Sequence, residues 1–411
     1  MTQEFLNMLY LFGCGALGKE VKNEYCQNLS LVRKLALRQE SWDVIYGALR
    51  EEIIAGKIQL PEDVFSILEK TFTANVAANI QRVEFNLLTV RKLMDKNIRC
   101  CILKGSSIAR LYKMPETRIS SDTDVLIDEK DEKKVCAILK EQGYTFEQRP
   151  KNDHHLKAYH KIGGLLEVHV SLHSIPTSDI ILDDEVHYTE PFMELSDGLY
   201  TLGVNDGLVY LSAHLIKHLI NDGTGVRQMM DLLLYMKEYD KAIDWEKYNA
   251  LMKKLSYYDF ICVIKGIGVK FWGMDFDDAI TEGEGMEALL VDCEIGGIFG
   301  YGEEERRSFY EAYNRRRAQK SGLGYTLYRI RSGEASVIKK LFPDAKVIKE
   351  RFNYVRKYPV LLPIGWVHRY IDVFLKAVGI IKEKPTQAST QKNGMLKRRM
   401  EMIEKLGMIK E

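Results

Sequence analysis

The chain has 411 residues, enough for two or three domains that each have a hydrophobic core. Apolar residues make up 46% and charged residues 28%, a composition that argues against a disordered or fibrous protein. The seven cysteines are odd in number and show no C-x-x-C spacing. This usage argues against zinc clusters and a disulfide framework, and it favours a reducing cytoplasm.

Residues 1–96 carry helical patterns and no motif that suggests chemistry. The apolar run Leu6–Leu17 is too short to cross a bilayer and lacks the basic start of a signal peptide, so it predicts a packed helix. A second helix is expected to start at Pro61 and to continue with regular apolar spacing to about Asp95. We therefore expect a helical region that lies beside a catalytic sheet.

Residues 97–200 are predicted to form the catalytic core. A strand over 99–103 leads into the turn Lys104-Gly105-Ser106, and a helix is expected from there to about Tyr112. The free backbone N–H groups of such a turn and a serine hydroxyl can hold a phosphate.

Two carboxylates stand at i and i+2 on the next predicted strand, where Asp122 and Asp124 alternate with Thr123. Side chains alternate across a strand, so both carboxylates point to one face. Neighbouring carboxylates repel each other unless a cation lies between them. This pattern suits Mg²⁺, which prefers oxygen ligands and keeps substrate phosphates in its remaining positions.

A third carboxylate, Glu167, is predicted on a strand over 165–170 that follows a glycine pair, and His169 shares its face. If this strand lies beside the one that carries Asp122, the three carboxylates form a cluster for two metal ions. A helix over 131–142 and strands near 144–148 and 155–160 complete a small mixed sheet, with helices on one side.

The Gly-Ser turn, the Asp-x-Asp strand and the later Glu-x-His strand resemble the DNA polymerase β-like nucleotidyltransferases. The closer resemblance is to a bacterial family of uncharacterised nucleotidyltransferases. It implies that Gly105 and Ser106 hold nucleotide phosphates, that Asp122 and Asp124 bind two Mg²⁺ ions, and that Glu167 binds the catalytic one. Lys104 replaces the first glycine of the usual Gly-Gly-Ser turn and can itself neutralise a phosphate.

The resemblance implies transfer of a nucleoside monophosphate from a nucleoside triphosphate to a hydroxyl acceptor, with release of pyrophosphate. The two helical regions suggest a closed cleft, which suits a small molecule, a sugar or a protein side chain as the acceptor better than a duplex. Arg118 is a candidate for stabilising the leaving phosphates or for anchoring the strand. The alternative from another class is a binding or scaffold protein that retains nucleotide without transferring it.

Residues 201–300 return to helical periodicity, and His214 and His218 lie at i and i+4 on one helical face. With Asp231 they suggest a second enzyme alternative, a metal-dependent hydrolase. The other interpretation is a substrate cleft formed by helical residues together with His169 of the sheet. The helical members of that cleft are His214, Lys217, His218, Arg227 and Asp231. Arg227 either pairs with Asp231 or reaches toward the nucleotide.

From Tyr301 onward, 25 Lys and Arg stand against 12 Asp and Glu, a net charge of about +13. Within the region 301–384, residues 351–370 mix basic, aromatic and aliphatic side chains. This segment is a candidate for peripheral contact with an anionic membrane, and the alternative is a packed segment with cationic ends at its surface. No signature of specific nucleic-acid binding is present, so a cytoplasmic protein with or without membrane contact is expected.

The last region, 385–411, is predicted to contain a polar linker and a short charged helix. The helix is expected from Met395 to about Leu406, either solvated or used for self-association. Taken together, these elements predict an α+β fold in which helical regions flank a small mixed sheet.

Overall fold

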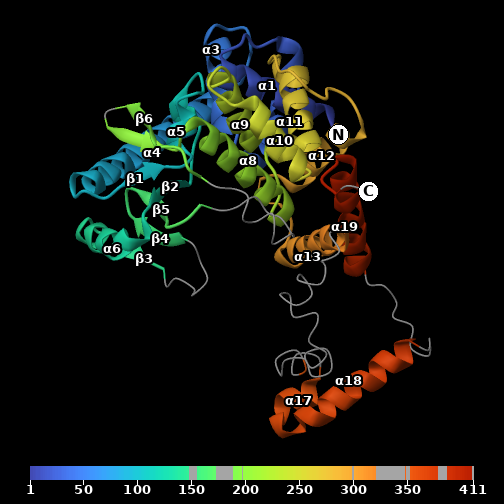
Figure 1. Ribbon diagram of the computed structural model, residues 1–411. Coiled ribbons are helices and arrows are strands. Elements are labelled where there is room, and N and C mark those ends of the chain that lie inside the picture. The colour runs from blue at the N-terminus through green and yellow to red at the C-terminus, as the bar shows by residue number, and fades with distance from the viewer. Residues whose placement is uncertain are drawn as a thin grey trace. The chain divides into compact units, whose positions relative to one another are not determined.

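The computed structural model describes residues 1–147, 155–172, 188–196, 198–298, 300–320, 348, 352–377 and 387–409. The chain divides into two compact units. The first comprises Met1–Thr177, Leu182–Arg306 and Met402–Glu411, and the second comprises Ser178–Ile181 and Arg307–Glu401. In the first unit the strands gather on one side and most helices on the other (Figure 1). The five regions expected from the sequence remain predictions.

The chain begins with helix α1 (Gln3–Leu17), a short helical turn η1 (Asn23–Tyr25), α2 (Leu29–Arg38) and α3 (Trp42–Ile54). The apolar run predicted to form a packed helix is confirmed as α1, most of whose side chains are buried. Its carbonyl at Leu9 accepts a hydrogen bond from Trp272 Nε1 at 3.0 Å. Helix α1 therefore packs in the same core as the helix that ends at Trp272, although the two bonded residues are 263 positions apart.

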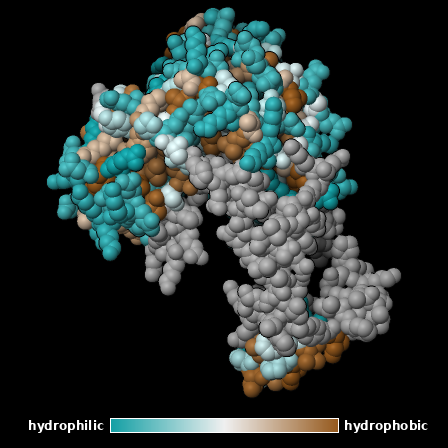
Figure 2. Space-filling view, in the orientation of Figure 1, coloured by the Kyte–Doolittle hydropathy of each residue, from teal (hydrophilic) through white to brown (hydrophobic). Residues whose placement is uncertain are grey.

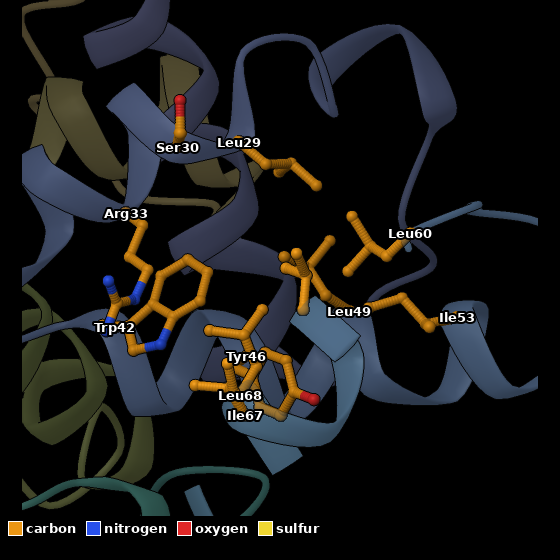
Figure 3. Close-up of a pocket in the computed structure, with 11 residues that line it drawn as sticks. Leu29, Ser30, Arg33, Trp42, Tyr46, Leu49, Ile53, Leu60, Ile67 and Leu68 are labelled. Atoms are coloured by element: carbon orange, nitrogen blue, oxygen red, sulfur yellow. The ribbon is translucent and has the colours of Figure 1, made fainter. Parts of the chain in front are cut away.

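An apolar pocket of about 360 Å³ lies between α2, α3 and the start of α4 (Glu62–Asp95). Figure 3 shows side chains from these helices around the hollow. Arg33 lies over the ring of Trp42, 5.7 Å from its centroid, and supplies the only charged lining group. None of the predicted site residues lines this pocket.

Helix α4 starts directly after Pro61, as predicted, and its 34 residues form one continuous element. Its first turns are mostly exposed, whereas Val90 and Leu93 near its end are fully buried against the sheet. Between them, Asn79 and Asn86 are buried polar residues, seven positions apart on one helical face. The second half of α4 therefore forms the layer behind the sheet.

The sheet has seven strands in the order β3-β4-β5-β2-β1-β7-β6. Pairing of β2 with β5 and of β1 with β7 is parallel, and the other described neighbours are antiparallel, so the sheet is mixed. The α+β fold with flanking helices is confirmed. The strands are β1 (Cys100–Ile102), β2 (Asp122–Ile127), β3 (Thr145–Phe146), β4 (His155–His160), β5 (Gly164–His169), β6 (Met193–Ser196) and β7 (Leu199–Thr201).

Both faces of the sheet carry packed apolar side chains. On one face, Val125 and Ile127 of β2 join Val90 of α4 and Val135 of α6 (Glu132–Glu141) in the main core. On the other face, Cys101 and Leu126 belong to a smaller cluster with Tyr210 of α8 (Val204–Asn221). The expectation of helices on one side is therefore wrong. The carboxylates of β2 share the face of Leu126, beneath α8.

Five helices complete the first unit: α8, α9 (Val226–Glu238), α10 (Trp245–Lys254), α11 (Tyr258–Trp272) and α12 (Glu284–Gly296). The end of the chain packs against them, because Met402, Ile403 and Leu406 are at most 1% exposed. Lys405 Nζ also lies 2.8 Å from Glu284 Oε2. The end of the chain is therefore not solvated, as one of the two predictions had it, and self-association stays a prediction.

The second unit contains most of α13 (Glu303–Lys320) and of α19 (Gln387–Lys405), with α17 (Asn353–Lys357), η4 (Pro359–Leu361) and α18 (Leu362–Ala377). The last helix begins eight residues before the predicted Met395, inside the expected linker, whose first two positions lie outside the described residues. Arg399 is buried over the ring of Phe309 at 4.0 Å. No helix among the described residues is long and apolar enough to cross a membrane.

Candidate active site

A short turn after β1 carries Lys104 and Gly105 to the carboxylate face. The backbone N–H of Leu103 donates to the carbonyl of Asp124 at 3.0 Å, which aligns the turn with β2. Gly105 has φ +74°, a left-handed conformation that favours glycine. Helix α5 (Ser106–Ala109) follows and is shorter than predicted. The Ser106 Oγ is buried and has no hydrogen-bond partner among the described residues, so a polar group remains available beside the turn.

The parallel pairing of β2 with β5 places Asp124 directly beside Glu167. His169 Nε2 lies 2.9 Å from Asp124 Oδ1 and 3.9 Å from Glu167 Oε2. These three residues each offer a ligand atom within 4.8 Å of the others, and no other such group occurs among the described residues. Strands β2 and β5 thus lie side by side, as predicted. Together they carry a donor set of two carboxylates and an imidazole.

Lys104 joins Asp122 to this group. Its Nζ lies 3.2 Å from Asp122 Oδ2 and 2.9 Å from Asp124 Oδ2, and its side chain is only 16% exposed. A single positive charge therefore lies between the two carboxylates of the Asp-x-Asp motif. The position favours a cation, because neighbouring anions in a poorly solvated site repel each other strongly.

Burial and charge shift the pKa values of these groups in opposite directions. Burial alone would raise the pKa of Asp124, but the charge of Lys104 and the contact with His169 outweigh it and hold that pKa well below its usual range. Burial and the neighbouring Asp124 raise the pKa of Glu167. For Lys104, the two aspartates overcome burial and raise the pKa of the ammonium. Lys104 and His169 therefore favour the anionic form of Asp124, whereas burial and Asp124 favour the protonated form of Glu167.

Arg118 lies in a buried ion pair behind the site. Its Nε and Nη2 donate to the two carboxylate oxygens of Asp231 at 2.8 and 2.5 Å, and the Tyr112 hydroxyl donates to the same carboxylate at 2.7 Å. This two-point contact fixes the segment before β2 to α9. The role of strand anchor that the sequence suggested for Arg118 thus has a partner, Asp231. The buried Nη1 of Arg118 has no hydrogen-bond partner among the described residues.

Replacement of Asp231 by asparagine is expected to lower the free energy of unfolding by about 3 kcal/mol, because Arg118 would remain buried without its counter-charge. Burial would raise the pKa of Asp231, but Arg118 outweighs it and lowers that pKa in the folded state. The stabilisation is therefore present above about pH 4 and is lost as the pH falls through the folded pKa. Urea unfolding from neutral to acidic pH should show the variant and the wild type converging in acid.

The partly exposed Asp128 is the control, since its ion pairs with Arg99 at 3.9 Å and with Lys130 at 3.1 Å both involve exposed cations. Asp128→Asn should change stability by less than about 1 kcal/mol. An equally small effect of Asp231→Asn would contradict a stabilising role for the buried pair.

The two helical histidines are in contact but have different surroundings. His214 lies in a pocket with Lys104, and burial together with that nearby charge lowers its pKa well below the usual range. His218 packs edge to face on His214 and has its Nδ1 3.4 Å from Asp222. Since Asp231 is bound by Arg118, the described residues give no three-ligand site for the hydrolase alternative.

The pocket that contains His214 collects seven of the predicted residues: Lys104, Gly105, Arg118, Asp122, His214, Arg227 and Asp231. Ser120, Leu211, Leu215 and Gln228 complete its lining. The predicted residues that do not line it are Ser106, Asp124, Glu167, His169, Lys217 and His218. Arg227 bonds to Glu40 at 2.5 Å and to the carbonyl of Ile119 at 2.6 Å, so its described ion-pair partner is not Asp231. Three basic side chains and one aspartate of the motif therefore meet in a polar pocket beside the glycine turn.

Two asparagines of helix α4 hold the segments around the site in place, and the sequence analysis did not identify them. Asn86 donates to Thr123 Oγ1 at 2.9 Å and to the carbonyl of Gly163 at 2.8 Å, and so ties β2 to the turn before β5. Asn79 donates to the carbonyl of Glu116 at 3.0 Å. Their spacing of seven residues in a helix is a usable signal, because amides on the packed face of a helix need partners. The helix described as chemically silent thus positions the carboxylate strands.

The family of uncharacterised nucleotidyltransferases matches residues 34–264, more than half of the chain. The matched region begins in α2 and ends in α11, so it contains the sheet, the pocket and the supporting helix α4. Neither the curated proteins nor the solved structures give a match to this chain. Because the match covers more than half of the chain, the chain belongs to the family of uncharacterised nucleotidyltransferases.

Proposed function

We propose that the protein is a Mg²⁺-dependent nucleotidyltransferase of the polymerase β-like type, which transfers a nucleoside monophosphate from a nucleoside triphosphate to a hydroxyl group. The observation that carries the proposal is the register of β2 and β5. It sets Glu167 beside Asp124, with Asp122 two residues away and a glycine turn next to them. We take the acceptor to be a small molecule, a sugar or a protein side chain, because helices pack on both faces of the sheet and this favours a small acceptor over a duplex.

The donor set suits the metal ions that this chemistry uses. Carboxylate oxygens are the ligands that Mg²⁺ prefers, and the ammonium between Asp122 and Asp124 marks a position where a cation is favourable. Asp122 and Asp124 would bind two Mg²⁺ ions, and Glu167 the catalytic one. When bound, the ions supply positive charge that neutralises the phosphates.

The residues around the turn are proposed to bind the triphosphate. Gly105 allows the close approach of backbone to phosphate, and the unpaired hydroxyl of Ser106 supports a role for that side chain. Lys104 belongs to the same turn. Its ammonium would have to leave the two carboxylates when Mg²⁺ binds them. We propose that it then contacts a phosphate. Arg118 and Arg227 also line the pocket beside the turn.

In the proposed reaction, the acceptor oxygen forms a bond to the α-phosphorus of the nucleotide while the bond from that phosphorus to the bridging oxygen breaks. Pyrophosphate carries away the electron pair. The hydroxyl proton passes to the carboxylate of Glu167, whose raised pKa suits a proton acceptor. His169 holds Asp124 in place, and His214 lies in the pocket with Lys104, where burial and the nearby ammonium lower its pKa and favour the neutral imidazole. Orientation and charge neutralisation supply most of the rate.

A cytoplasmic location is part of the proposal. All seven cysteines are free thiols, and the five buried ones lie in β1 or in helices of the first unit, without a disulfide partner among the described residues. Free buried thiols are typical of reducing compartments.

The proposal is tested with nucleoside triphosphates that carry a radioactive label at the α-phosphate or at the γ-phosphate. In an extract of the source cells, the α-label is expected to move to an acceptor and the γ-label to appear in pyrophosphate. Transfer of the γ-label to an acceptor would instead indicate a kinase. Release of the γ-label as inorganic phosphate without transfer would indicate a hydrolase.

A further inference from the structure

One helix of the second unit exposes an apolar stripe. Val360, Ile364, Val367 and Ile371 are 83, 56, 58 and 51% exposed, respectively. Their spacings of four, three and four residues place them along one side of η4 and α18. Tyr358, 53% exposed, extends the stripe at its start. We call these five residues the α18 stripe, and Figure 2 shows hydrophobic side chains gathered in this part of the second unit.

The stripe is not the core-facing side of the helix. On another side, Leu362 and Trp366 pack against a small core formed by Ile348, Phe352 and Val355. Gly365 allows this contact, because a Cβ at that position would lie 2.5 Å from Ile348 Cγ2. A helix that already has a core and still exposes a second row of aliphatic side chains has a surface left for another partner.

The charges around the stripe are positive. Residues 307–401 contain 22 Lys and Arg against 7 Asp and Glu, a net charge of about +15. From Phe352 to Ile371 the sequence has no acidic residue, and Arg356, Lys357 and Arg369 lie within it. Arg356 and Lys357 are exposed next to Tyr358, with Lys357 Nζ 5.5 Å from the centre of that ring. Basic and aromatic groups therefore border the apolar row.

We propose that the α18 stripe binds the surface of an anionic lipid membrane, with the helix lying in the plane of the interface. Aliphatic side chains would enter the boundary between headgroups and acyl chains, while basic side chains contact the headgroup charges. The 16 residues of α18 are too few to span a bilayer. A second copy of the chain is a poorer occupant, since its own basic unit would bring like charges together.

Flotation of the full-length protein with lipid vesicles tests the proposal. Vesicles of phosphatidylcholine with about 30% phosphatidylglycerol should carry the protein, whereas pure phosphatidylcholine should bind it much less, and salt should weaken binding. Ile364→Glu with Val367→Glu should reduce binding at least tenfold, about 1.4 kcal/mol or more, because two buried aliphatic groups are lost. Circular dichroism establishes that the double variant is folded.

The matched control is Ile54→Glu, which changes an aliphatic residue of α3 that is 62% exposed. It should bind vesicles like the wild type. The proposal is overturned if anionic vesicles do not bind the wild type, or if the double variant binds them equally well. It is also overturned if the wild type is an oligomer that the double variant disrupts, since the stripe would then be an interface between copies.

Discussion

Lys104→Met is expected to tighten the binding of Mn²⁺, a substitute for Mg²⁺, by at least tenfold in the absence of nucleotide. In the wild type the ammonium lies 3.2 and 2.9 Å from the carboxylates of Asp122 and Asp124, so a metal ion competes with it. Without Mn²⁺ the variant should be less stable by about 3 kcal/mol, because the buried Asp124 and the partly exposed Asp122 lose their counter-charge. Calorimetric titration gives the affinity, and thermal unfolding should show a larger Mn²⁺-induced rise in Tm for the variant.

Nucleotide binding should change in the opposite direction. If Lys104 contacts a phosphate after it leaves the carboxylates, the methionine variant loses a charge-assisted hydrogen bond and binds the triphosphate about tenfold more weakly. Lys130→Met is the control, since Lys130 forms an exposed pair with Asp128 at 3.1 Å, far from the turn in sequence. Equal Mn²⁺ affinity in Lys104→Met and the wild type would mean that the lysine does not compete with metal.

Asp124→Asn is expected to reduce nucleotidyl transfer by about a thousandfold or more. The amide has nearly the shape of the carboxylate and can still accept a hydrogen bond from His169, but it lacks the negative charge that a metal ion needs. Asp124 lies beside both Lys104 and Glu167, so loss of its charge changes the electrostatic environment of both residues. Transfer of the α-label, measured over time at saturating nucleotide, gives the ratio of rates.

The control for this variant is Asp128→Asn, which changes a partly exposed carboxylate just beyond the end of β2. Its transfer rate should stay within about twofold of the wild type. A similar rate for Asp124→Asn and the wild type, with both proteins folded, would exclude the carboxylate cluster as the catalytic centre.

The local patterns of the sequence predicted much of the sheet. The strand over 155–160 has the predicted bounds, and the strands with Asp122 and Glu167 differ from the prediction by few residues. Alternation of apolar and polar residues predicts such strands directly, because alternate side chains point to the buried face and to the other face. The hairpin β6–β7 was missed because its strands have four and three residues and β7 pairs with the distant β1.

The side-chain partners of the site required the fold. Arg118 and Asp231 are 113 residues apart, so no local spacing indicates that they bind each other. Arg227 lies four residues before Asp231, yet its ion pair is with Glu40 of the loop between α2 and α3. A helical spacing permits an i, i+4 contact, but a buried partner from another element can take its place when it satisfies more hydrogen bonds.

The cation between the two aspartates also depends on the fold. The sequence indicated that Lys104 departs from the usual glycine and suggested a phosphate as its partner. In the structure the partners of Lys104 are the two carboxylates. The turn after β1 directs the lysine side chain to the face of the sheet that carries Asp122 and Asp124. The terminal helix gives a similar lesson. Its charged composition suggested solvent, yet Met402, Ile403 and Leu406 form a narrow apolar side that is buried.

The most direct test of the central claim is calorimetric titration of the protein with each of the four ribonucleoside triphosphates in Mg²⁺. The wild type is compared with the double variant Asp122→Ala plus Asp124→Ala. We predict that the wild type binds at least one triphosphate and that binding is lost in the folded double variant, which would locate metal and nucleotide at the β2–β5 cluster. Binding that is equal in both proteins, or absent from the wild type, would contradict the account.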